Sequence, residues 1–91
     1  MLRKAPDQTY EHLRAVSLFR ETGNRPEEGR TLNQLGDVHA DAGDLAAARD
    51  TWRRAADLLD QVGPAEQVAA IRAKLDRVDR RASIARTNGR A

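Results

Sequence analysis

The sequence predicts an all-α protein of about four helices, and three observations support this fold class. Apolar residues recur at three- and four-residue steps in several segments, which is the spacing of one helix face. Glycine followed by Asn, Asp or Pro separates these segments at short intervals, as expected where helices end. The 91 residues include one Trp, one Tyr and one Phe, and 33% are charged, which indicates one small helical domain.

The segment 29–62 is predicted to form two antiparallel helices joined by a tight turn at Gly43 and Asp44. The apolar stripe of the first helix consists of Leu32, Leu35, Gly36 and His39. The apolar stripe of the second helix consists of Leu45, Ala48, Trp52, Ala55, Leu59 and Val62. Gly36 has no side chain, so a neighbouring helix can approach closely there. Asp44 is a suitable N-cap for the helix that begins at Leu45.

The pattern Leu32-x-x-Leu35-Gly36-x-x-His39, followed by Ala48-x-x-x-Trp52-x-x-Ala55, resembles the tetratricopeptide repeat. The resemblance implies stacked helical hairpins, a fragment of an α-solenoid. It implies structural roles for Leu35, Gly36, Ala48, Trp52 and Ala55, with Gly36 and Ala48 as close contacts and Trp52 as the bulky plug. The chain departs from the family pattern at His39, at Leu32 and in lacking a closing proline. The fold alone says little about function.

A shift of forty residues extends the repeat in both directions, because Phe19 then aligns with Leu59 and Gly23 with Gly63. Residues 6–23 are therefore predicted to be the second half of an earlier repeat, and residues 27–63 a full repeat. Residues 65–81 are predicted to be a capping half repeat, since Asp76 falls where Gly36 stands and a polar outer face ends a solenoid.

The two ends of the chain lie outside the predicted helical domain, which spans 6–81. Residues 1–5 are interpreted as a short lead-in. Residues 82–91 lose the apolar periodicity and contain the breaker Asn88-Gly89, so we expect a basic, disordered tail there.

The first helix has no helical partner on its outer side, where we expect partial exposure of Tyr10, Leu13, Val16 and Phe19. Two explanations remain open. The chain is the carboxy-terminal part of a longer repeat array, which we favour, or two copies form a homo-oligomer through this helix.

The sequence offers no catalytic constellation. There is no cysteine, and Ser17 and Ser83 have no histidine at helical spacing. Neither form of glycine-rich phosphate loop occurs. We therefore expect no enzyme activity and no cofactor. His12 is interpreted as a structural residue.

Metal binding is not expected either. The ligand-type side chains cluster at Asp37, His39, Asp41 and Asp44. Asp37 and Asp41 share one helix face, whereas His39 points to the opposite, packed side, so these groups do not converge on one ion. We expect His39 to be partly buried in the position where the family has an aromatic residue.

The resemblance implies a binding groove, because the first helices of successive tetratricopeptide repeats line a concave surface that takes an extended peptide. The matching charged and amide positions are Arg30, Asn33, Asp37, Asp41, Arg77 and Arg81. Asn33 would bond a ligand backbone as donor and acceptor. The acidic and basic patches suit a peptide of mixed charge. The alternative is that these residues simply form solvated faces.

A nucleic-acid role is the second class of function considered. Residues 72–91 carry seven cations and two acids, whereas residues 1–71 carry nine cations and twelve acids. A basic segment attracts phosphates in a nonspecific, salt-dependent way. No aromatic residue lies among these arginines and no recognition helix precedes them, so direct nucleic-acid binding is not the expected main function.

Segments 18–24 and 32–36 are similar to the carboxy-terminal repeats of large actinobacterial transcriptional regulators. That resemblance implies a sensor, oligomerisation or partner surface within a regulatory protein. No apolar run approaches the roughly 20 residues of a membrane span, and no signal peptide is evident, so we expect a cytoplasmic protein.

Overall fold

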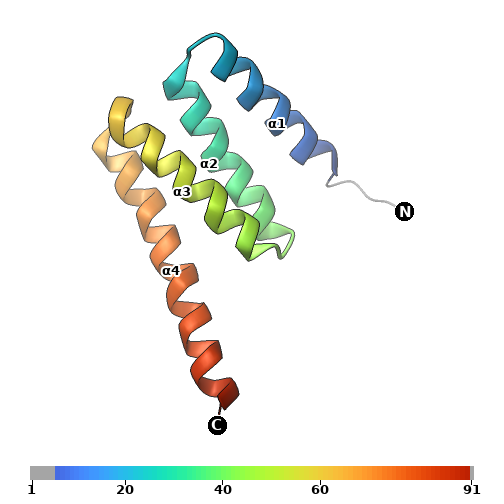
Figure 1. Cartoon of the computed structure of the whole chain (residues 1–91), viewed down its shortest axis with the longest axis vertical. Helices are drawn as coiled ribbons and strands as arrows, with labels where there is room; N and C mark the ends of the chain where they lie inside the picture. Colours follow the sequence, from blue (N-terminus) through green and yellow to red (C-terminus); the bar gives the residue numbers. More distant parts are fainter. Residues whose placement is uncertain (1–5, 91) are drawn as a thin grey trace.

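The computed structural model describes the backbone of residues 6–90 and the side chains of residues 8–84. The described residues form four helices: α1 (Pro6–Glu21), α2 (Arg25–Asp41), α3 (Leu45–Val62) and α4 (Ala65–Arg90) (Figure 1). The predicted all-α fold is confirmed. None of these helices combines the length and apolar character needed to cross a membrane.

Each helix packs chiefly on its neighbours in the sequence, α1 on α2, α2 on α3 and α3 on α4. In Figure 1, α2 and α4 run in the same general direction and α3 runs back between them. α4 begins beside the end of α3 and then diverges from it. The fold is therefore a series of consecutive helical hairpins.

The turns after α1 and α2 are built alike. Gly23 and Gly43 have φ angles of 74° and 87°, in the left-handed region that favours glycine. The next residues, Asn24 and Asp44, cap the following helices: each side chain accepts a hydrogen bond from the backbone N–H three residues later, at 3.4 and 3.1 Å. The predicted Gly43-Asp44 turn and the N-cap role of Asp44 are confirmed.

The core lies mainly between α2 and α3 and continues onto one face of α4. Its buried apolar residues are Val16, Leu32, Leu35, Ala48, Trp52, Ala55, Ala56, Leu59, Val68 and Ile71. The middle of the predicted α3 stripe is buried, whereas its two ends, Leu45 and Val62, are 41% and 39% exposed. The helices around α3 cover its centre more completely than its ends.

Two glycines of α2 allow α3 to approach closely. A Cβ atom on Gly36 would lie 2.2 Å from Cδ1 of Trp52, and one on Gly29 would lie 2.6 Å from Cδ2 of Leu59. Gly36 thus has the close-contact position expected of it. Gly29 has the same role one heptad earlier, which the sequence pattern did not single out.

The outer face of α1 differs in part from the predicted one. Tyr10 and Leu13 are 61% and 51% exposed and Phe19 is half-buried, so their predicted partial exposure is confirmed. Val16, in contrast, is only 5% exposed and belongs to the core, and Leu18, which was not predicted to be exposed, is 58% exposed. The reason is that α2 packs on the side of α1 that carries Val16 and Phe19, which helical spacing alone does not determine.

The carboxy-terminal segment also differs from the prediction. We expected the last helix to end at 81 and a disordered tail to follow, but α4 continues to Arg90. Alanine and arginine favour helices, and no proline follows Pro64, so the helix has no reason to stop at 81. Asn88 and Gly89 themselves lie within α4. Residue 91 lies outside the described residues.

Candidate partner-binding face on α2 and α4

The predicted binding positions of α2 lie on one side of that helix. Their spacing of three, four and four residues places Arg30, Asn33, Asp37 and Asp41 along a single stripe. Arg30 and Asp41 are exposed, whereas Asn33 and Asp37 are half-buried. The middle of the stripe is therefore covered by a neighbouring element.

The covering residue is Lys74 of α4. Its ammonium group donates hydrogen bonds to Oδ1 of Asn33 at 2.9 Å and to Oδ1 of Asp37 at 2.8 Å. The indole Nε1–H of Trp52 donates to the same Asp37 oxygen at 3.1 Å and to the backbone oxygen of Asn33 at 3.2 Å. The Lys74 nitrogen lies 5.4 Å from the centroid of the Trp52 ring. These four residues, here called the Lys74 cluster, connect α2, α3 and α4.

The Lys74 cluster leaves part of the Asn33 amide available. Lys74 uses one of the two lone pairs on the Asn33 side-chain oxygen. No residue within 8–84 accepts a hydrogen bond from its NH₂ group. The Asp37 carboxylate, in contrast, already accepts from both Trp52 and Lys74. Asn33 is therefore the member of the cluster best placed to donate to a ligand.

Arg77 and Arg81 follow Lys74 on the same side of α4, one and two turns further along the helix. Both are exposed. Arg81 lines a hollow of about 330 Å³ with Leu45, Arg49, Val78 and Ala82, where α3 begins. No ion pair in the described part of the chain joins Asp41 to either arginine.

Of the six predicted binding residues, the structure thus brings together Asn33 and Asp37, and it does so through Lys74. Sequence reasoning missed Lys74 itself. The signal was present, because Lys74 has helical spacing to Arg77 and Arg81 and so belongs to the same basic stripe. The sequence alone does not give the distance between that stripe and α2.

Ion pairs also connect the other packed helices. Arg20 of α1 pairs with Glu28 of α2 at 3.0 Å, which compensates the burial of Glu28, 8% exposed. Arg49 of α3 pairs with Asp79 of α4 at 3.5 Å. Arg30 pairs with Glu27 within α2. Arg30 is therefore partly neutralised, whereas Arg77 forms no ion pair among the residues whose side chains are described.

The histidines have local roles. His12 Nδ1 lies 2.6 Å from the backbone oxygen of Gln8, within one turn of α1. His39 is half-buried, as predicted for the position that carries an aromatic residue in the repeat pattern. Within the described residues, no three side chains from His, Cys, Asp and Glu are grouped to hold a metal ion.

In comparisons with known proteins, the chain matches no family model, no curated protein and no solved structure. The interpretation of the α2–α4 face therefore rests on its geometry and on the repeat pattern in the sequence.

Removal of the Lys74 side chain tests the importance of this connection. Lys74→Ala is expected to lower the free energy of unfolding by about 1 kcal/mol, because it removes one partly exposed ion pair, the hydrogen bond to Asn33 and one cation–π contact. For a domain of this size that loss lowers the melting temperature by about 4 to 8 °C, measured by circular dichroism. Arg77→Ala is the matched control and should leave the melting temperature unchanged. Equal melting curves for the two variants would contradict the proposed connection.

Proposed function

We propose that this chain is a tetratricopeptide-like protein interaction module without catalytic activity, which binds an extended peptide or partner segment along the α2–α4 face. The observation that carries the proposal is the Lys74 cluster. It connects the polar stripe of α2 to the basic stripe of α4, and α3 runs between these two helices (Figure 1).

The unpaired groups on this face suit a ligand of mixed charge. Asp41 and Arg77 are exposed and form no ion pair within residues 8–84. Asn33 retains its NH₂ donors for a ligand carbonyl. A peptide backbone between the two helices would receive the Asn33 hydrogen bond, and its charged side chains would pair with Asp41 and Arg77.

The experiment begins with peptide display against the full chain, followed by calorimetry on the selected peptides. Asn33→Ala should weaken binding about fivefold, the effect of one lost hydrogen bond. Asp41→Ala should weaken the binding of peptides that carry a basic residue. Arg77→Ala should weaken the binding of peptides that carry an acidic residue. Arg53→Ala and Asp60→Ala, exposed on α3, are matched controls and should bind as the unmodified chain does.

NMR chemical-shift mapping with the same peptides gives an independent measurement. The largest changes should fall on α2 and α4, around Asn33 and Arg77. Failure to select any peptide, equal affinity of all five variants, or shifts confined to another surface would each argue against the proposed groove.

A second candidate function is that of a sensor or oligomerisation fragment of a cytoplasmic regulator with weak, nonspecific nucleic-acid attraction. The observation that favours it is the continuation of α4 to Arg90, which makes the basic segment from 72 onward a helix. Binding to a random DNA duplex that falls steeply with salt would support this alternative. If the chain does not bind the DNA duplex even at low salt, this second candidate function is contradicted.

A further inference from the structure

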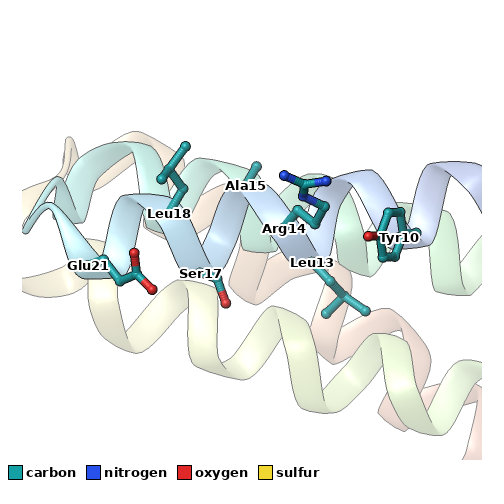
Figure 2. A pocket seen from close by; sticks show the side chains of 7 residues that line it. All are labelled: Tyr10, Leu13, Arg14, Ala15, Ser17, Leu18 and Glu21. Atoms are coloured by element: carbon teal, nitrogen blue, oxygen red, sulfur yellow. The ribbon is translucent and has the colours of Figure 1, made fainter.

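The outer face of α1 forms a surface that no other described helix contributes to. Figure 2 shows its side chains, and every one belongs to α1. They line a shallow hollow of about 500 Å³ and are Tyr10, Leu13, Arg14, Ala15, Ser17, Leu18 and Glu21. Tyr10, Leu13 and Leu18 are each more than half exposed and lie together on this one face of the helix. We call this surface the α1 face.

The charges of the α1 face are placed in a particular order. Arg14 and Glu21 are two turns apart on one side of the helix, and Ser17 and Leu18 lie midway between them. The Arg14 guanidinium carbon is 5.8 Å from the centroid of the Tyr10 ring. Glu21 has no side-chain partner in the described part of the chain. One positive and one negative group therefore flank Ser17 and Leu18.

This face is unlike the surface that α3 presents to α2. There the contact residues are Ala48, Trp52 and Ala55, all of them buried and none charged. A further hairpin that packed on the α1 face in the same way would have to cover Arg14 and Glu21. Burying two charges is costly unless each receives an opposite partner. The occupant of the α1 face should therefore supply one acidic and one basic group at matching positions.

We propose that this occupant is a second copy of the chain, bound through α1 in an antiparallel arrangement about a twofold axis near Ser17 and Leu18. Antiparallel pairing about that point places Arg14 of each copy opposite Glu21 of the other. The same register places Leu18 of each copy opposite Ser17 of the other, close to the axis. A parallel pairing in register would instead set like charges against each other. The α1 face is thus complementary to itself, as a twofold interface requires.

The contact should be weak and reversible. A helix of 16 residues is about 24 Å long. One face of such a helix buries less than the roughly 1,200 Å² at the low end of specific stable interfaces. Dimers should therefore form in a concentration-dependent equilibrium. The α1 face is separate from the proposed peptide groove on α2 and α4, so either proposal stands if the other fails.

Charge reversal tests the proposal by sedimentation equilibrium of the full chain, from about 10 μM to about 1 mM, a range suited to weak association. The unmodified chain should shift from monomer to dimer. R14E and E21R should each weaken dimerisation at least tenfold, because each brings like charges together in a homodimer. An equimolar mixture of R14E and E21R should dimerise again, since one variant carries two acidic and the other two basic residues at these positions. The double variant R14E/E21R should dimerise as the unmodified chain does.

The control is R53E, which makes the same charge change on the exposed side of α3 and should leave dimerisation unaltered. Arg14 and Glu21 are exposed, so all variants should keep the helicity of the unmodified chain, checked by circular dichroism. A chain that stays monomeric across the whole range overturns the proposal. So does association that R14E and E21R leave unchanged, or that their mixture fails to restore.

Discussion

Replacement of Trp52 by alanine is expected to lower the free energy of unfolding by about 3 to 5 kcal/mol, the usual cost of removing a large core aromatic. The Trp52 side chain is 5% exposed and contacts Gly36 across the α2–α3 interface. Its removal opens a cavity there and also deprives Asp37 and Asn33 of the indole N–H. A domain of 91 residues has a total stability of about 5 to 14 kcal/mol, so the loss is a large fraction of it.

Urea denaturation followed by far-ultraviolet circular dichroism measures this effect. Trp52→Phe is the matched variant, because it keeps much of the ring but removes the N–H donor. It should cost about 1 to 2 kcal/mol through the lost N–H donor and the smaller ring, clearly less than Trp52→Ala. A Trp52→Ala chain with an unchanged midpoint would mean that the indole does not fill the α2–α3 interface.

Gly36→Ala is expected to lower the free energy of unfolding by about 1 to 3 kcal/mol, the range typical of an overpacked core. Alanine is intrinsically better than glycine in a helix by about 1 kcal/mol. A loss of stability would therefore mean that the steric clash with Trp52 outweighs this helix preference. The new Cβ atom would lie 2.2 Å from Cδ1 and 2.4 Å from Nε1 of Trp52. The indole is rigid and enclosed, so the helices must separate to make room.

The control for this substitution is Gln34→Ala, two residues away on the exposed side of α2, which should change stability by no more than about 0.5 kcal/mol. In the Trp52→Phe background the smaller ring should relieve the clash, so the two substitutions should cost less together than the sum of their separate effects. Strict additivity, or a Gly36→Ala chain more stable than the unmodified one, would contradict the close contact.

The features that could be predicted from the sequence are those set by local interactions. Gly43 and Asp44 determine the turn between α2 and α3 because a left-handed residue and an N-cap act within a few residues. The centre of the α3 stripe was recognisable for the same reason, since helical spacing brings Ala48, Trp52 and Ala55 to one side. Leu45 and Val62 continue that spacing, yet they are partly exposed, because burial depends on how far the neighbouring helices reach.

The features that could not be predicted depend on how the helices dock. Val16 and Leu18 are both apolar, and only the position of α2 decides that the first is buried and the second exposed. The Lys74 contacts join residues 37 and 41 positions apart in the sequence. At the carboxy terminus Asn88 and Gly89 do not end the helix, because the helix preference of the preceding residues continues α4 to Arg90.

The position of the single tryptophan has a spectroscopic consequence. Trp52 is the chain's only indole, and it lies where α2, α3 and α4 meet, with the Lys74 ammonium group over its ring. Its fluorescence therefore reports the mutual position of three helices without any added label. Separation of α4 would remove the neighbouring charge and admit water, and opening of the α2–α3 hairpin would expose the ring fully. One emission spectrum thus distinguishes loosening of the last helix from unfolding of the central hairpin.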